Sequence, residues 1–382
     1  GIYKGTITVS ADGCKSVPLA LEVEVWDFVL PDGTHLKTAF TYSEALSKRF
    51  YKKQWSDELS MKYYDFLLDH RLNIDSLYYS YERDPELMKY GKSRGMNAFN
   101  LFYFKGNDTP KELVKEIRIR MERLEKAGVD DIVYFYGFDE CDEDQFDKLR
   151  EICDGVHESF PNLPISTTSY DTSFGLSTGL RNAIDWWVPL TPKYDLEKAR
   201  ALRKEGKQMW WYTCCAPTNP YANWFVEDPA IEARLLMGAM SFKYEVDGFL
   251  YFFTNLWELC DTPITSGPYT DWFPGSGGKD RVYANGDGSI FCPGPDGPLT
   301  TIRMENIRDG LDDYEYLHML SELVRKAEQA PDRASKAEDV RRAKELLAVP
   351  DSVVETMIRF TESPEILEDF RQEVAALIQQ LK

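Results

Sequence analysis

Residues 110–140 read PKELVKEIRIRMERLEKAGVDDIVYFYGFDE, and this stretch decides the fold class. Its first part predicts a helix over Pro110–Ala127, because apolar side chains recur every three to four residues until Gly128. Those side chains are Leu113, Ile117, Met121 and Leu124. Directly afterwards, Asp131–Tyr136 has the length and aromatic content of a buried strand. A helix that leads into a buried strand is half of a βαβ unit, which predicts a parallel sheet covered by helices.

The same alternation of short apolar runs and amphipathic segments extends in both directions along the chain. We predict eight strands from these runs: Leu36–Thr41, Leu72–Tyr79, Ala98–Phe104, Asp131–Tyr136, Pro164–Ser169, Ala183–Pro189, Gln208–Thr213 and Val246–Phe253. Further helices are predicted at Asp142–Ser159, Asp195–Lys204 and Asp228–Tyr244. Eight strands alternating with helices over about 270 residues match a (β/α)8 TIM barrel. The alternative, a doubly wound open sheet, normally has a Gly-rich phosphate turn after its first strand, whereas residues 41–44 read TYSE.

The barrel is expected to occupy residues 32–330. Residues 1–31 contain two apolar runs that alternate with polar residues. Two strands alone are marginal in water, so we interpret them as the end of an N-terminal β-sandwich domain, or as strands that pack on the barrel. A long helix is predicted from about Thr301, and residues 331–382 are expected to form a C-terminal helical extension.

Composition excludes several classes of protein. The net charge of −19 argues against a protein that binds nucleic acid by neutralising phosphates. Hydrophobic residues make up 43% of the chain, which is ordinary for a globular protein, and no long apolar stretch predicts a membrane span. The seven cysteines form no CxxC pair and the four histidines stand far apart, so we expect no metal and no cofactor.

The best candidate for chemistry is the pair Asp139 and Glu140, which follows the fourth predicted strand. In barrel enzymes the reacting groups come from the C-terminal ends of the strands. The alternative is that both acids cap the next helix, but Asp142, Glu143 and Asp144 already supply that charge. Tryptophan and tyrosine at neighbouring strand ends favour a sugar site, because aromatic faces stack on sugar rings.

Paired carboxylates at a barrel mouth suggest glycoside hydrolysis, in which one acid protonates the leaving oxygen. Enzymes with two independent carboxylates place them on either side of the scissile bond. Two consecutive residues of one strand cannot easily reach both sides of that bond. A pair on one strand suits the substrate-assisted exception, in which a 2-acetamido group of the substrate is the nucleophile.

Several motifs together resemble glycoside hydrolase family 123 from Gly1 to about Leu320. They are FVLP (28–31), GFDE (137–140), DWWVP (185–189), WWYTC (210–214), GFLYFFTNLW (248–257), GDGSIFCPG (286–294) and IRMENIRDGLDDYEYL (302–317). The resemblance implies a (β/α)8 barrel after a β-sandwich, no metal, and retention of configuration through an oxazoline intermediate. The family's Asp-Glu pair corresponds to Asp139 and Glu140.

Five further residues are candidates for contacting the substrate. They are Tyr170, Trp187, Tyr212, Asn255 and Trp257. A hydroxyl at Tyr212 would position the acetamido oxygen, the tryptophans would form a sugar platform or a pocket for the acetamido methyl, and Asn255 would bind a sugar hydroxyl. Each also has a structural interpretation as a residue of the barrel wall. Asp171 is a weaker candidate, and Arg303 and Arg308 are expected to form ion pairs along the C-terminal helix with Asp309, Asp312 and Asp313.

These observations lead us to expect a retaining exo-β-N-acetylgalactosaminidase that acts on a glycan or glycoconjugate ending in β-linked N-acetylhexosamine. Two alternatives remain: a conventional two-carboxylate glycosidase with Glu258 or Asp261 as the partner, and a non-catalytic carbohydrate-binding barrel. Because such glycans lie outside cells, we expect a secreted or cell-envelope protein, although no signal peptide opens the sequence.

Overall fold

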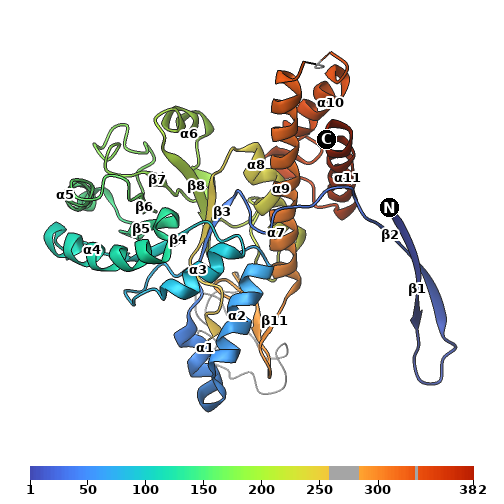
Figure 1. Ribbon diagram of the computed structural model, residues 1–382, viewed down its shortest axis with the longest axis horizontal. Coiled ribbons are helices and arrows are strands. Elements are labelled where there is room, and N and C mark those ends of the chain that lie inside the picture. The colour runs from blue at the N-terminus through green and yellow to red at the C-terminus, as the bar shows by residue number, and fades with distance from the viewer. Residues whose placement is uncertain (258–283, 332–333) are drawn as a thin grey trace.

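A seven-stranded, all-parallel sheet curls nearly into a barrel, with helices around it (Figure 1). The computed structural model describes residues 1–257, 284–331 and 334–382. The strands are β3 (Lys37–Phe40), β4 (Phe99–Phe104), β5 (Val133–Gly137), β6 (Ile165–Thr167), β7 (Trp186–Trp187), β8 (Gln208–Thr213) and β9 (Gly248–Tyr251). They pair in the order β3-β9-β8-β7-β6-β5-β4. The (β/α)8-type barrel is confirmed, and seven of the eight predicted runs contain a strand.

The prediction of a strand at Leu72–Tyr79 was wrong. This segment lies between β3 and β4, where a barrel needs its second strand, but it makes only a single parallel bridge, between Thr41 and Asp75. Two backbone bonds remain, from the N–H of Tyr42 to the carbonyl of Asp75 at 3.0 Å and from the N–H of Tyr103 to the carbonyl of Tyr79 at 3.3 Å, and side chains replace the rest of the ladder. Asn73 donates its side-chain amide to the carbonyl of Thr38 at 2.8 Å, and the hydroxyl of Thr41 accepts from the backbone N–H of Leu77 at 3.0 Å.

On its other side, the segment 72–79 is bonded to β4 through Asp75 and Asn100. The Asp75 carboxylate accepts from the backbone N–H of Asn100 at 2.9 Å, from the guanidinium of Arg83 at 3.1 Å and from the hydroxyl of Tyr134 at 2.5 Å. Asn100 in turn donates to the carbonyl of Leu77 at 2.9 Å. We call the segment 72–79, with these bonds on both sides, the seam of the barrel.

The barrel interior is filled by alternate residues of the strands, most of them aromatic. Tyr134 and Tyr136 of β5, Trp186 of β7 and Trp210 of β8 belong to this inner cluster, and the rings of Trp186 and Trp210 stack at 5.1 Å. Their sequence neighbours face the helices instead. Gly248 of β9 makes room for these rings, because a Cβ there would lie 2.3 Å from the Trp210 ring.

The helices that surround the sheet are α1 (Glu44–Tyr51), α2 (Asp57–Asp69), α3 (Pro85–Ser93), α4 (Pro110–Ala127), α5 (Phe146–His157), α6 (Leu196–Arg203), α7 (Ile231–Leu235) and α8 (Ser241–Lys243). Of these, α4 to α8 fall within the predicted ranges, whereas α1 to α3 were not predicted. The predicted helix over Asp228–Tyr244 is interrupted by a π-helical turn at Leu236–Met240. At this turn Gly238 packs against the carbonyl of Gly310, which a Cβ at Gly238 would approach to 2.8 Å.

The two ends of the chain lie on the same side of the barrel (Figure 1). Helix α9 (Ile302–Gln329) begins at the predicted residue, Thr301, and packs against α7, α10 (Ala337–Leu347) and α11 (Pro364–Leu381). Strands β10 (Cys292–Pro293) and β11 (Pro298–Leu299) form a small hairpin, as do β12 (Val354–Thr356) and β13 (Arg359–Phe360). Strands β1 (Ile2–Val9) and β2 (Val17–Glu24) form an exposed antiparallel hairpin that extends away from the barrel. No helix of the described residues is long and apolar enough to cross a membrane.

Candidate active site

The end of β5 turns so that two consecutive carboxylates reach the mouth of the barrel. Successive side chains of a strand normally point to opposite faces. Here Phe138 and Glu140 adopt the left-handed backbone region, with φ of 50° and 51°. Non-glycine residues pay a conformational cost in this region, and such strain concentrates at functional sites. The turn explains how Asp139 and Glu140 both find partners among residues that line one mouth.

Asp139 is held by hydroxyl groups from three segments. Its Oδ1 accepts from Tyr136 of β5, from Thr168 after β6 at 2.9 Å, and from Tyr78 of the seam at 3.5 Å, a long contact. Its other oxygen, Oδ2, accepts no hydrogen bond from any residue that the structure describes. Burial raises the pKa of Asp139, the hydroxyl donors oppose the rise, and the Glu140 charge adds to it. The hydroxyl groups therefore fix the carboxylate through Oδ1, and Oδ2 keeps its capacity to accept a hydrogen bond with respect to the described residues.

Glu140 has partners on β8 and in the loop after β6. Its Oε1 accepts from the hydroxyl of Tyr212 on β8 at 2.5 Å. Burial and the nearby Glu140 carboxylate raise the pKa of both Tyr212 and Tyr170, which follows β6, so both hydroxyls are protonated at neutral pH. The structure thus brings Tyr170 and Tyr212 to the acid pair, and the hydroxyl of Tyr212 contacts Glu140.

Thr168 couples the two acids. Its hydroxyl donates to Asp139 and accepts from the backbone N–H of Glu140 at 2.9 Å. The hydroxyl of Tyr103, on β4, accepts from the backbone N–H of Asp139 at 3.3 Å. Each acid is therefore positioned through its backbone as well as its side chain.

Aromatic rings that the sequence analysis did not select line the mouth beside Asp139. Tyr78 stacks on Phe253 at 5.8 Å between ring centroids, and Tyr103 lies 5.7 Å from Tyr78 and 6.0 Å from Tyr136. One signal was present in the sequence: Tyr134 and Tyr136 alternate along one strand that ends at the acid pair. That period of two places Tyr136 on the interior face.

Three predicted contact residues are not brought to the pair. Trp187 lies on the outer face of β7, 1% exposed, against Phe174. Asn255 is fully buried, and its amide bonds the backbone N–H and carbonyl of Ser43 at 3.0 and 2.9 Å. Trp257 donates its indole N–H to the carbonyl of Phe291 at 2.9 Å. The polar groups of Asn255 and Trp257 thus bond the backbone of other segments, whereas the buried indole N–H of Trp187 has no hydrogen-bond partner among the described residues.

The remaining candidates also have structural partners. Asp171 is buried and accepts hydrogen bonds from its own loop, at Ser173 and Gly175. Arg303 is buried and donates to three backbone carbonyls of neighbouring loops, and Arg308 pairs with Glu305 and Asp309. The expected pairing of Arg308 with Asp312 and Asp313 was wrong, because those acids bind Arg71, Arg234 and Arg371 from other segments of the chain. Glu258 and Asp261 lie outside the described residues.

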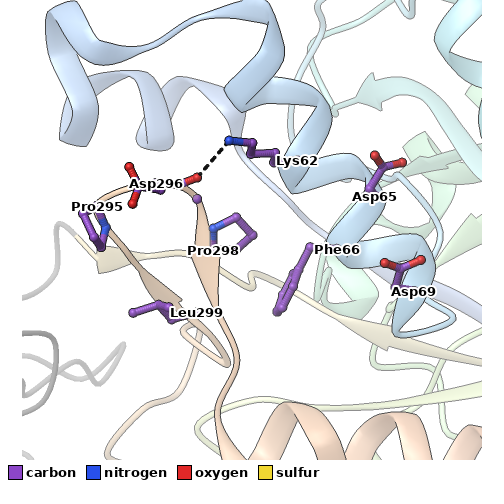
Figure 2. A pocket seen from close by; sticks show the side chains of 9 residues that line it. Lys62, Asp65, Phe66, Asp69, Pro295, Asp296, Pro298 and Leu299 are labelled. Atoms are coloured by element: carbon purple, nitrogen blue, oxygen red, sulfur yellow. Dashed lines mark hydrogen bonds between the residues drawn. The ribbon is translucent and has the colours of Figure 1, made fainter.

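Two other features resemble sites but are explained by packing. A hollow of about 450 Å³ lies between α2 and β11 (Figure 2). Two of its lining residues, Asp65 and Asp69, both pair with Arg94. His35, Glu315 and His318 offer ligand atoms within 4.8 Å of one another. However, the two imidazole rings stack at 3.5 Å with planes only 13° apart, so their in-plane lone pairs run side by side and do not converge on one ion.

Comparison with known proteins gives the following likenesses. The family model described as "Glycoside hydrolase 123, catalytic domain" matches residues 39–320. A solved family 123 glycoside hydrolase from Clostridium perfringens, described in terms of glycolipid glycan hydrolysis, has 18% identity and a TM-score of 0.62, covering 100% of this chain and 75% of that one. A β-D-glucuronidase from Dictyoglomus thermophilum has 12% identity and a TM-score of 0.41, covering 81% and 57%. A GH2 β-galacturonidase from Eisenbergiella tayi has 11% identity and a TM-score of 0.40, covering 82% and 57%. No curated protein matches the chain.

Proposed function

The chain belongs to glycoside hydrolase family 123, and we propose that it is a retaining exo-β-N-acetylgalactosaminidase that uses the substrate's 2-acetamido group as nucleophile. The observation that carries this proposal is the adjacency of Asp139 and Glu140, each with its own set of hydroxyl partners. Two consecutive residues cannot easily flank a scissile bond, but they can serve the two ends of one reacting unit: the acetamido group and the leaving oxygen.

In this mechanism Asp139 orients the nucleophile. Its open oxygen, Oδ2, accepts a hydrogen bond from the acetamido N–H while the acetamido oxygen attacks the anomeric carbon. Positive charge then develops on the acetamido nitrogen, and a carboxylate fixed beforehand by Tyr136 and Thr168 stabilises that charge without reorganising. The stacked rings of Tyr78 and Phe253 offer an apolar surface for the sugar next to Asp139.

Glu140 acts on the leaving group. It donates a proton to the glycosidic oxygen as the bond to the anomeric carbon breaks, which leaves a cyclic oxazolinium. In the second step it takes a proton from the water that opens this ring, so the product keeps the β configuration. Tyr212 holds the Glu140 carboxyl in position for both steps.

The first test is a panel of nitrophenyl β-glycosides of N-acetylgalactosamine, N-acetylglucosamine and galactose. We expect turnover of the acetamido sugars, preference for the galacto configuration, and strong inhibition by a thiazoline analogue of the oxazoline. Turnover of the galactoside without an acetamido group would favour a conventional two-carboxylate enzyme. Binding of sugar with no turnover would favour a non-catalytic barrel.

The second test separates the two acids. Glu140→Gln should lower kcat/KM by about 10²–10⁴-fold on a phenyl glycoside, because it removes proton donation. The loss should shrink on a dinitrophenyl glycoside, whose leaving group needs little protonation. Asp139→Asn should reduce turnover of both substrates alike, and rescue of Asp139→Asn by the better leaving group would reverse the assigned roles.

A further inference from the structure

A cavity of about 230 Å³ opens between the loops that follow β6 and β7. Its walls include Ser169, Tyr170 and Phe174 from the first loop and Pro189, Leu190 and Lys193 from the second. Pockets for drug-sized ligands measure about 300–1,000 Å³, so this cavity suits a single sugar ring.

The cavity adjoins the acid pair. Thr168, which bonds both acids, lines it, and so does Tyr170, whose pKa the nearby Glu140 carboxylate raises. The hydroxyls of Tyr78 and Tyr103, which contact Asp139, come from the seam and β4, on the other side of β5 in the sheet order. In the proposed mechanism Glu140 protonates the leaving oxygen, so the leaving group must lie on the side where this cavity opens.

The chemistry of the walls is specific. The hydroxyl of Ser169 is buried and has no hydrogen-bond partner among the described residues, which leaves a polar atom without compensation until something binds. Phe174, Pro189 and Leu190 supply apolar surface of the kind that packs on the C–H face of a sugar.

Two charged residues line the cavity, and only one is available to a ligand. The Asp171 carboxylate is 5% exposed and is occupied by Ser173, Gly175 and Thr178 of its own loop. Lys193 is exposed, and its ammonium forms no ion pair with any carboxylate of the described residues. In a chain with a net charge of −19, Lys193 thus gives the cavity one positively charged wall residue.

We propose that this cavity is the leaving-group subsite and that Lys193 makes the enzyme favour a leaving sugar that carries a negative charge, a uronate or a sulfated hexose. The inference rests on the proposed function and adds the class of the second sugar. Ser169 binds a hydroxyl of that sugar, and Lys193 binds its anionic group.

The experiment compares three substrates with the same terminal β-N-acetylgalactosamine: a nitrophenyl glycoside, a disaccharide ending in glucose, and one ending in glucuronate. A fourth, with glucose 6-sulfate, distinguishes sulfate from carboxylate as the group recognised. We expect the wild type to favour the charged disaccharides over the glucose disaccharide. Because Lys193 is exposed, Lys193→Met should lower kcat/KM by about two- to fivefold on the charged substrates only. Lys204→Met, a matched change of an exposed lysine at the end of α6, should leave all substrates unaffected.

Ser169→Ala should reduce turnover of every disaccharide but not of the nitrophenyl glycoside, which lacks the second sugar. Equal turnover of the glucose and glucuronate disaccharides by the wild type would overturn the proposal, as would an equal effect of Lys193→Met on all substrates. Calorimetric titration of Glu140→Gln with the disaccharides gives a readout independent of turnover. Failure to hydrolyse any aryl glycoside would refute the proposed function, while Lys193-dependent binding of the charged disaccharide would still support the subsite.

Discussion

Replacing Tyr136 by phenylalanine should change the pH dependence of catalysis more than its maximum rate. Tyr136 is fully buried, and its hydroxyl is one of the donors that hold the ionised form of Asp139 against the rise in pKa caused by burial. A hydrogen bond to a charged group contributes about 1.5–3 kcal/mol. Losing it raises the pKa of Asp139 further, so the acidic limb of the kcat/KM profile moves to higher pH. At a fixed pH on that limb, the loss of about 1.5–3 kcal/mol corresponds to a decrease of about 10–150-fold.

The matched control for this change is Tyr134→Phe. Tyr134 lies two residues earlier on β5, also inside the barrel, and donates to Asp75 at 2.5 Å in the same way. Both variants lose one buried hydroxyl that serves a carboxylate, so both should lose stability toward urea at neutral pH. Only Tyr136→Phe should move the acidic limb, measured with a nitrophenyl β-N-acetylgalactosaminide. A limb that stays in place in Tyr136→Phe, or that moves equally in Tyr134→Phe, would refute this account of Asp139.

Three further outcomes are expected. Thr168→Val should lower kcat/KM by about 10–100-fold for good and poor leaving groups alike, because one hydroxyl positions both acids. A much smaller loss on a dinitrophenyl glycoside than on a phenyl glycoside would contradict this. Gly248→Ala should cost about 1–3 kcal/mol of unfolding free energy in urea, because its Cβ overlaps an interior indole, while Gly5→Ala in the exposed hairpin should cost little. The Glu315 carboxylate raises the pKa of His35 in the folded protein. The pair therefore stabilises the fold at pH values below the pKa of histidine in the unfolded chain, and this stabilisation is lost as pH rises through the pKa of His35 in the folded protein. His35→Asn should therefore destabilise the protein more at about pH 5.5 than at about pH 8.5, and equal losses at both would disprove the assignment.

The repeat of strands and helices could be predicted from the sequence because each unit carries a local signal. The helix over Pro110–Ala127 matches α4 residue for residue, since periodicity, an N-terminal cap and Gly128 all agree. The seam could not be distinguished from a strand. Its apolar residues, such as Leu72 and Leu77, are buried as in a strand, but the bonds of Asn73 and Asp75 to neighbouring segments depend on long-range placement.

The site was predictable only in part, because the sequence shows neither which face of a strand points inward nor which distant residues meet. The sequence WW at 186 and 187 requires one indole inside the barrel and one outside, but does not say which, and the prediction selected Trp187, which faces outward. Asn255 looked available because a polar residue follows an apolar strand. Its partner, Ser43, is 212 residues away along the chain and could not be foreseen.

The seam also has a consequence for how freely this sequence can vary. A strand ladder is built from backbone groups that nearly every amino acid carries, so most exchanges within it preserve the hydrogen bonds. In the seam between β3 and β4, few bonds join backbone to backbone, and others belong to the side chains of Asn73, Asp75 and Asn100, so a substitution there removes them. We expect a saturation library selected for activity to tolerate few replacements at these three positions. The intolerance would come from closing the barrel, although the profile would look like that of catalytic residues.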